Sequence, residues 1–308
     1  MTEKPLVVLG SVNADHILKV ESFPRPGETV SGHGYRVVAG GKGANQAVAA
    51  ARLGAKAAFI ACVGDDDFGS RMVDAFASEG IDTQAVMQVE KVPTGVAIIY
   101  VSQTGENSIG ISPESNACLT PERLVPHLGL IKGASALLMQ LETPMETLEM
   151  AAAKAKESGV PVILNPAPAR PLSDALLNGL SMITPNETEA EVLTGVKVTD
   201  ASSAEKAAKK LHTKGVKTVV ITLGSKGAFA STGAESQMVS GYPVKAVDTT
   251  AAGDTFNGGL AAALQKGAPL SKALAFANAA AALSVTGEGA QPSIPTLEKT
   301  RALLEKSV

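Results

Sequence analysis

The amino-acid sequence predicts an α/β protein with a doubly wound, mostly parallel sheet, helices on both faces, and a small antiparallel β lid. Short apolar runs without polar alternation, such as residues 6–9 and 218–223, are typical of strands buried on both faces. Helical stretches separate these runs, and several end at glycine, as the Ala-rich residues 45–53 do at Gly54. Two other regions alternate between apolar and polar residues, which indicates a separate, antiparallel sheet.

Strands and helices follow one another over most of the chain. The expected strands are residues 6–9, 57–63, 136–139, 160–164, 182–183 and 218–223, and the expected helices are 45–53, 68–78, 143–157, 187–193, 203–214, 253–265, 270–285 and 296–304. The alternating regions, 30–38 and 95–111 with a turn at 105–107, predict a lid built from residues 12–38 and 94–112. Two ordinary surface hairpins would give the same pattern. No Pro/Ser-rich linker divides the sequence, so we expect a single domain over residues 1–308.

The composition is that of an ordinary globular protein. Hydrophobic residues make up 45% of the 308 positions and charged residues 19%. The 27 basic and 30 acidic residues give a net charge of −3, which argues against nucleic acid or a membrane surface as the main partner. The N-terminal residues lack the pattern of a signal peptide, and no apolar run is long enough to span a membrane. Cys62 and Cys118 are far apart in sequence and form no metal or redox motif, so a cytoplasmic location is expected.

The segment 248–256 is the most informative part of the chain. Small residues precede Asp254 at the start of a predicted helix. Unpaired backbone N–H groups at a helix start bind anions, and small side chains let a phosphoryl group approach them. Asp254 would take a proton from an attacking hydroxyl while the amides of Ala252 and Gly253 hold the γ-phosphoryl group. The alternative is that Asp254 only caps the helix.

Several motifs together show a resemblance to a known family. They are GSxNxD at residues 10–15, GGKGAN at 40–45, PNExE at 185–189 and DTxAAGD at 248–254. In this order and spacing they resemble the ribokinase family of carbohydrate kinases, over essentially the whole chain. The resemblance implies transfer of phosphate from ATP to O5 of D-ribose, giving D-ribose 5-phosphate and ADP, with Asp254 as general base. A kinase of the same fold for another sugar or nucleoside, such as deoxyribose or fructose, is the nearest alternative, and a non-catalytic sugar or nucleotide sensor is a second one.

The glycine-rich loop at residues 40–43 fits neither of the best-known phosphate-binding loops. Lys42 is followed by Gly43 rather than Ser or Thr, and the dinucleotide fingerprint is absent after the first strand. The resemblance implies a sugar-side loop whose glycines let the backbone approach the substrate, whereas a mobile glycine turn is the alternative. It assigns sugar binding to Asn13, Asp15, Gly41, Lys42, Gly43, Asn45, Glu142 and Asp254. Carboxylates and amides suit adjacent hydroxyl groups, although solvated loop residues would have the same side chains.

The resemblance also implies a nucleotide side. Its ATP contacts are Asn186, Thr222, Gly224, Ser225, Lys226, Gly227, Ala252, Gly253 and Asn278. Glu189 would hold the Mg²⁺ that accompanies ATP, partly through water, as Mg²⁺ prefers. A capped helix with acidic first-turn residues explains Asn186 and Glu189 as well. Asn278 stands where close members of the family often carry histidine beside the adenine, so the contact at this position stays open.

A monovalent cation, K⁺, is implied beside the anion site. The matching positions are Asp248, Thr250, Ser284, Gly287, Gly289 and Ser293, mostly through backbone carbonyls. A purely structural C-terminal loop is the alternative. Residues 113–117 depart from the GANA-like pattern of the family next to the lid. Pairing two lids through their exposed edges would hide unpaired strand groups, so a homodimer is expected.

Overall fold

The computed structural model describes residues 3–306 and contains the predicted doubly wound, mostly parallel sheet. Its nine strands lie in the order β13-β12-β11-β10-β9-β8-β1-β4-β5, so that the chain starts in the interior of the sheet and builds outward on both sides. Neighbouring strands from β11 to β5 are parallel, and the edge pairs β11–β12 and β12–β13 are antiparallel. The strands are β1 (Leu6–Leu9), β4 (Ala57–Gly64), β5 (Asp82–Val89), β8 (Ala136–Met139), β9 (Val162–Leu164), β10 (Met182–Ile183), β11 (Thr218–Thr222), β12 (Gly227–Ser231) and β13 (Ser236–Ser240).

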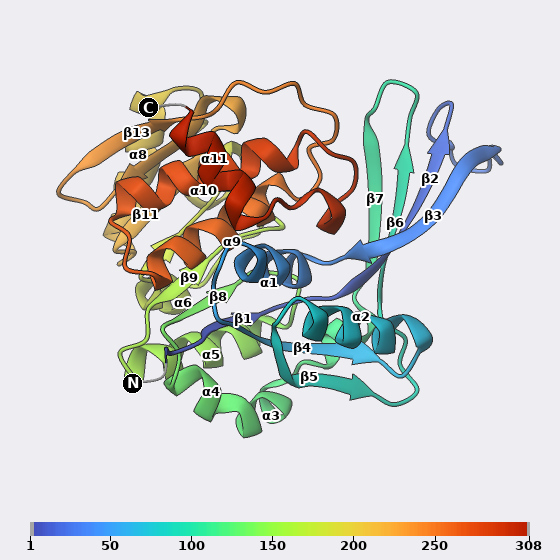
Figure 1. Cartoon of the computed structure of the whole chain (residues 1–308), viewed down its shortest axis with the longest axis horizontal. Helices are drawn as coiled ribbons and strands as arrows, with labels where there is room; N and C mark the ends of the chain where they lie inside the picture. The colour runs from blue at the N-terminus through green and yellow to red at the C-terminus, as the bar shows by residue number, and fades with distance from the viewer. Residues whose placement is uncertain (1–2, 307–308) are drawn as a thin grey trace.

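Helices cover both faces of this sheet because its central strands are apolar on both sides. In β1, Leu6 and Val8 belong to one core cluster, and Val7 and Leu9 belong to the other. The first layer comprises α1 (Lys42–Arg52), α2 (Asp67–Ser78), α9 (Ala252–Gln265) and α10 (Leu270–Ser284), with α11 (Leu297–Glu305) packed on α10. The second layer comprises α3 (Pro121–Leu124), α4 (Leu128–Lys132), α5 (Met145–Glu157), α6 (Asp174–Gly179), α7 (Glu187–Thr194) and α8 (Ala201–Thr213). Figure 1 shows α1 and α9 side by side at the centre of the molecule.

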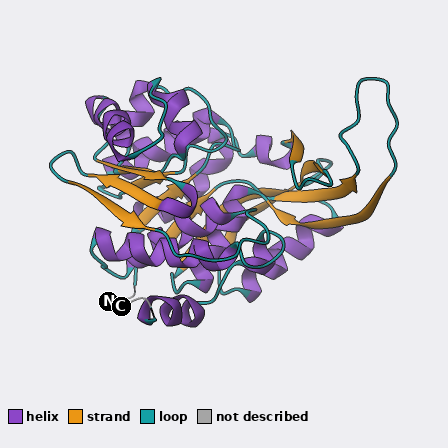
Figure 2. Cartoon of the chain, turned by 90° about the horizontal axis from the view of Figure 1, so that it is seen from above, coloured by secondary structure: helices purple, strands orange, loops and turns teal. Residues whose placement is uncertain are grey.

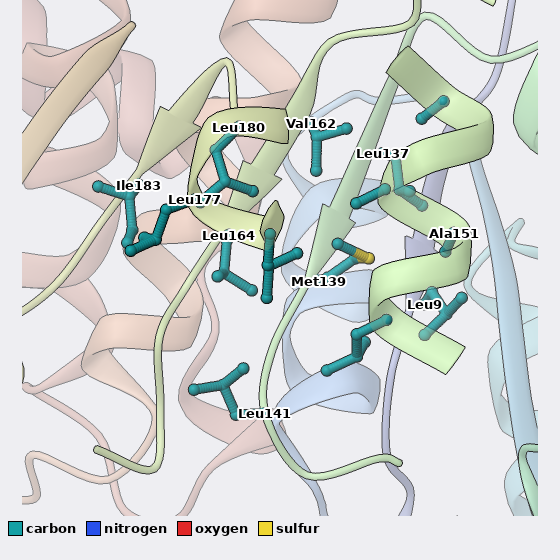
Figure 3. Packing of buried hydrophobic residues seen from close by; sticks show 14 of the residues in the cluster. Leu9, Leu137, Met139, Leu141, Ala151, Val162, Leu164, Leu177, Leu180 and Ile183 are labelled. Atoms are coloured by element: carbon teal, nitrogen blue, oxygen red, sulfur yellow. The ribbon is translucent and has the colours of Figure 1, made fainter. Parts of the chain in front are cut away.

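The core of the second layer lies between α5, α6 and the sheet (Figure 3). Leu9, Leu137 and Met139 are fully buried there, and Ala151 of α5 packs in the same cluster. Burial of one such large side chain contributes about 1.5–3 kcal/mol, so this core holds the strand ends rigidly in place. Within residues 3–306, no helix combines the length and the apolar character needed to cross a membrane.

A second, separate sheet stands off the main body (Figures 1 and 2). It contains β2 (Asn13–Val20), β3 (Gly32–Gly40), β6 (Gly95–Val101) and β7 (Asn107–Ser112) in the order β3-β2-β6-β7. The pairs β2–β3 and β6–β7 are antiparallel as predicted, whereas the central pair β2–β6 is parallel. The parallel pair arises because both strands leave the main body at its edge and run outward together. Two independent surface hairpins are thereby excluded, since both regions share one sheet.

Some elements differ from the sequence prediction. The strands β5, β12 and β13 and the short helices α3, α4 and α6 were not predicted. β12 has the sequence GAFAS, which contains no β-branched residue, and becomes a strand because it is buried between its two neighbours. The predicted helices and strands are present, with ends shifted by a few residues, as is usual at frayed or capped ends.

Candidate active site

The predicted site residues lie along one edge of the main sheet, where parallel strands end. β8 is followed by Gln140 and Glu142, β9 by Asn165, and β10 by Thr184. In open α/β sheets this edge is where ligands bind. The starts of α1 and α9 lie at the same edge, where side chains of the two helices are hydrogen bonded to each other.

Asp254 is the centre of the site. It lies in the first turn of α9 and is only 7% exposed. Its two carboxylate oxygens accept hydrogen bonds from Asn45 Nδ2 (3.0 Å, to Oδ2) and Gln46 Nε2 (2.9 Å, to Oδ1). Burial raises the pKa of Asp254, and the nearby Lys42 ammonium and these two hydrogen bonds only partly offset that effect. A carboxyl group with a raised pKa is a better proton acceptor than an ordinary aspartate.

The first turn of α9 is open to an anion. Among the described residues, no side chain caps this helix start, and the N-cap residue Ala251 has a left-handed backbone (φ 59°, ψ 15°). Gly253 is exposed, and a Cβ added to it would meet no atom within 4 Å. The Ala252 amide makes a long hydrogen bond to the Thr249 carbonyl (3.3 Å), and the space beside Gly253 is open at the positive end of the helix dipole. This open helix start is compatible with the anion site predicted at Ala252 and Gly253.

The glycines of residues 40–43 pack closely against neighbouring protein atoms. A Cβ on Gly40 would lie 2.0 Å from Oδ2 of Asp15, and one on Gly43 would lie 2.3 Å from the backbone N of Ser11. Gly41 has φ 89°, and its Cβ would meet backbone atoms of residues 11–13. These glycines therefore make room for protein atoms and bring the loop against the end of β1. This packing alone explains the glycines, and it does not test whether the backbone also approaches a substrate.

The same loop is tied to Glu142. Glu142 Oε2 accepts hydrogen bonds from the Lys42 backbone N (3.0 Å) and from Ser11 Oγ (2.5 Å). The charges of Asp254, Glu142, Glu189 and Asp15 raise the pKa of Lys42 and outweigh the effect of its burial, which acts in the opposite direction. Lys42 is therefore a protonated cation that faces four carboxylates.

Two of the residues predicted to bind sugar have buried oxygens without hydrogen-bond partners. Within residues 3–306, Asp15 Oδ1 and Asn45 Oδ1 are buried and accept no hydrogen bond. Asn13 is 3% exposed, and its Oδ1 accepts from Asn116 Nδ2 (2.8 Å), which leaves the Asn13 amino group as a donor. Burial, and then the charges of Glu142 and Asp254, raise the pKa of Asp15 to about 7. Because unpaired buried acceptors are unfavourable, this set is arranged for hydroxyl groups.

On the nucleotide side, Asn186 and Glu189 form a complete capping box at the start of α7. The Asn186 backbone N donates to Glu189 Oε2, and the Glu189 backbone N donates to Asn186 Oδ1, both at 2.8 Å. The capped-helix alternative is therefore present in the structure, but it uses only one carboxylate oxygen of Glu189. Burial, opposed by the Asn186 hydrogen bond and the Lys42 charge, leaves the pKa of Glu189 raised.

The remaining positions predicted for the nucleotide lie at the end of β11, in the turn that follows it and in α10. An isolated parallel bridge joins Asn186 to Thr222 at the end of β11. Gly224, Ser225 and Lys226 form an exposed turn before Gly227. Asn278 is buried in α10 and donates from Nδ2 to the backbone carbonyls of Val239 (3.0 Å) and Ser240 (3.2 Å), so its amino group supports the end of β13.

The positions predicted for a monovalent cation lie on two segments, before α9 and at and after the end of α10, and a hydrogen bond between Gly289 and Asp248 joins these segments. Asp248 Oδ1 accepts from the backbone N and Oγ1 of Thr250 (2.9 and 2.6 Å), while its Oδ2 accepts from the Gly289 backbone N (2.9 Å). Although burial raises the pKa of Asp248, the hydrogen bonds from Thr250 and Gly289 and the Arg36 charge lower it overall. Gly287 packs on Ser293, and the Ser284 hydroxyl donates to Ala281 O (2.9 Å).

Several residues that support the site were missed in the sequence. Gln46, Gln140, Asn165, Thr184, Asn257 and Asn116 are buried and hydrogen bonded to site residues or to one another. A signal was present, because Gln140, Asn165 and Thr184 each follow directly on a predicted buried strand. Polar residues at those positions indicate a shared polar edge.

Fold and site together define a small-molecule phosphotransferase. The sequence profile of the pfkB family of carbohydrate kinases matches residues 3–297. The ribokinase of Haemophilus influenzae is 53% identical over 302 residues, which cover 98% of this chain and 99% of that protein. The deoxyribokinase of Salmonella typhimurium is 38% identical over 295 residues, 96% of each chain. The solved structure of Arabidopsis thaliana ribokinase complexed with ribose and ATP matches with a TM-score of 0.93 at 36% identity, over 99% of each chain.

The chain belongs to the pfkB family of carbohydrate kinases, and the resemblance to ribokinases that its motifs predicted is confirmed.

Proposed function

We propose that this protein transfers the γ-phosphoryl group of ATP to O5 of D-ribose, giving D-ribose 5-phosphate and ADP, with Asp254 as general base. The observation that carries the proposal is the position of Asp254, a buried carboxylate in the uncapped first turn of α9 that is hydrogen bonded to the sugar-side residue Asn45. The high identity to a ribokinase over nearly the whole chain supports the choice of ribose.

The proposed reaction assigns a role to each part of the site. Asn13, Asp15, Gly41, Lys42, Gly43, Asn45 and Glu142 bind the sugar, whose hydroxyl groups pair with the unpaired oxygens of Asp15 and Asn45. Asp254 accepts the O5 proton as O5 attacks the γ-phosphorus, and the bond to the β–γ bridging oxygen breaks. The amides of Ala252 and Gly253 stabilise the charge on the transferred group, and Lys42 adds a cation beside it. The nucleotide is held by Asn186, the segment 222–227 and Asn278.

Both expected metal ions fit the residues present. Glu189 keeps one carboxylate oxygen outside its capping box, which suits a Mg²⁺ held through water and the phosphates of ATP. Mg²⁺ would supply charge neutralisation on the phosphates. For K⁺, Asp248 supplies a carboxylate that accepts hydrogen bonds from Thr250 and Gly289, and its backbone N donates to the carbonyl of Val285 (3.2 Å), next to Ser284. Backbone carbonyls of the segment with Ser284, Gly287 and Ser293 would complete the site. K⁺ there would order the turn that leads into α9.

The second sheet is proposed to act as the lid of a single domain and to pair with the lid of a second copy. Closure over the sugar would exclude water and limit ATP hydrolysis. The sheet exposes Tyr35 (63%), Ile109 (52%) and Ile111 (49%) on its edge strands, which supports a homodimer. Light scattering tests this, because Ile109→Asp would then give a monomer. A cytoplasmic location is proposed because Cys62 and Cys118 are free thiols.

Phosphorylation of 2-deoxyribose is the second candidate, because a deoxyribokinase is 38% identical to this chain. A non-catalytic sensor is less well supported, since it would have no use for a buried base at Asp254. The test is an ADP-release assay with ribose, 2-deoxyribose, fructose and a nucleoside. The proposal expects the highest kcat/KM for ribose, because a site built for a hydroxyl group leaves its own groups unpaired when that hydroxyl is missing. Equal values for ribose and 2-deoxyribose would contradict it, and no ADP release with any acceptor would favour the sensor.

A further inference from the structure

A chain of buried hydrogen bonds runs beneath the site. It consists of Gln46, Asn165, Thr184 and Asn257, which we call the relay, and each of these side chains is at most 7% exposed. Gln46 Nε2 donates to Asn165 Oδ1 (2.9 Å), and Asn165 Nδ2 donates to the Thr184 carbonyl (3.3 Å). Thr184 Oγ1 donates to Asn257 Oδ1 (2.6 Å), and Asn257 Nδ2 donates to the Gly253 carbonyl (2.8 Å).

The direction of every bond in the relay is determined by its two ends. The Asp254 carboxylate accepts only, so the amino group of Gln46 must face it, and the second N–H then points to Asn165. At the other end, the Gly253 carbonyl also accepts only, so Asn257 presents its amino group there and its oxygen to Thr184. No amide of the relay can flip without placing two donors or two acceptors against each other. The side-chain conformations are therefore unique, which is the advantage of a fully satisfied buried network.

Both ends of the relay meet the first turn of α9. One end fixes Oδ1 of Asp254, and the other holds the carbonyl of Gly253, whose own amide belongs to the anion site. Between these ends the relay passes from α1, which carries the sugar-side loop, to Thr184, which directly precedes the nucleotide-side segment 185–189. Asn45 holds the opposite oxygen of Asp254, on the sugar side.

We propose that Gln46 is a positioning residue for phosphoryl transfer: through its bond to Asp254 and through the relay, it sets the angle of the base relative to the anion-binding amides. This inference rests on the proposed function, since it assumes that Asp254 is the base. Gln46 is the right group for the task because it is uncharged. The charges that face Asp254, which are those of Lys42, Glu142, Glu189 and Asp15, change their balance when substrates bind, whereas an amide donor does not.

The test compares Gln46→Met with Gln140→Met. Gln140 Nε2 donates to Gln46 Oε1 (2.6 Å) and is equally buried, but it does not contact Asp254, so the pair is matched in size, burial and chemistry. For Gln46→Met we expect kcat for ribose to fall about 10- to 100-fold, the usual effect of a hydrogen bond to a charged group. The KM for ribose should change by less than about threefold because Asn45 is intact. Gln140→Met removes the donor to Gln46 Oε1 but leaves the bond from Gln46 to Asp254, so its kcat should fall by a smaller factor than that of Gln46→Met.

The pH profile separates positioning from mere stability. Without the Gln46 hydrogen bond the pKa of Asp254 rises further, so the acid limb of the kcat profile should move to higher pH in Gln46→Met and stay in place in Gln140→Met. If Gln46→Met does not fold, Thr184→Val provides a second test. It breaks the relay at a nearly isosteric side chain and should lower kcat without moving the KM for ribose.

The outcomes are distinguishable. An unmoved acid limb together with kcat within about twofold of wild type in Gln46→Met overturns the inference while leaving ribose phosphorylation intact. An unchanged kcat in Thr184→Val would likewise overturn the inference and leave ribose phosphorylation intact. Absence of ribose-dependent ADP release in the wild-type protein would instead contradict the proposed function itself.

Discussion

Replacing Asp254 by Asn removes the proposed proton acceptor while keeping nearly the same side-chain shape. Gln46 is held by Gln140 and Asn165, so the oxygen of the new amide must face Gln46 and its amino group must face Asn45. Asn45 can adapt by turning its amide, because its own Oδ1 has no partner within the described residues. The variant should therefore fold, with a melting temperature within a few degrees of wild type.

The expected loss is in turnover. General acid–base catalysis contributes ~10²–10⁴ in rate, which corresponds to roughly 3–5 kcal/mol of transition-state stabilisation. In Asp254→Asn, kcat for ribose should fall by at least that factor. ATP affinity should remain within about threefold, because the amides of the anion site are unchanged. ADP release at saturating substrates measures the first, and calorimetric titration with ATP measures the second.

A matched control is Asp200→Asn. Asp200 also lies at a helix start, where it caps α8 on the other face of the sheet, and its carboxylate accepts hydrogen bonds from Ser203. The same substitution there should leave kcat unchanged and change stability little, because Asn caps a helix start about as well as Asp. If Asp254→Asn retained turnover within threefold of wild type, the assignment of the base would be refuted.

Other changes test the remaining parts of the site. The folded-state pKa of Asp15, about 7, lies above its unfolded value of 3.8, so the stability linked to this group is complete below pH 3.8 and is lost as the pH rises through about 7. Asp15→Asn should therefore be more stable than wild type at pH 8, by roughly 1–3 kcal/mol, but not at pH 4. An increase in the free energy of unfolding by urea that is the same at both pH values would contradict this. In the same variant, any preference for ribose over 2-deoxyribose should be smaller than in wild type. Gly253→Ala should leave the melting temperature unchanged or slightly higher, since the position is helical and open, yet lower kcat at least ~10-fold by filling the anion site; an unchanged kcat would count against that site. Potassium should raise activity relative to tetramethylammonium at constant ionic strength, and Asp248→Ala should blunt the response; a flat titration in the wild-type protein would show that the loop is only structural.

The main sheet and most helices could be predicted because their signal is local. Apolar strands such as β1 and β11 are buried on both faces, and that alone determines their pattern. β5 and β13 lie at the sheet edges with largely polar residues, so they resemble loops until a neighbouring strand pairs with them. The parallel pairing of β2 with β6 depends on how two distant segments leave the main body, which no local pattern encodes.

The same distinction holds in the site. Asp254, Asn45 and Glu142 could be found because motifs mark them, and the structure brings Asp254 and Asn45 into direct contact. Gln46 directly follows the motif that contains Asn45, and its role could not be predicted, because its partners Gln140 and Asn165 become its neighbours only after the sheet has formed. Ser11 and Asn116 were missed for the same reason, because each acts by holding a site residue rather than by contacting a ligand.

The separation of Asn45 and Asp254 along the chain has a consequence for synthesis. The two residues share a hydrogen bond, yet they are 209 positions apart in the sequence. At ~5–20 residues per second on the ribosome, the sugar-side loop emerges roughly 10–40 seconds before the base does. During that interval the central strands β1, β4 and β8 can already pair, so the nascent protein has much of its sheet and an incomplete site. A growing chain therefore has neither the carboxylate nor the helix start needed to act on ATP, and the proposed activity begins only after α9 has left the ribosome and docked against α1.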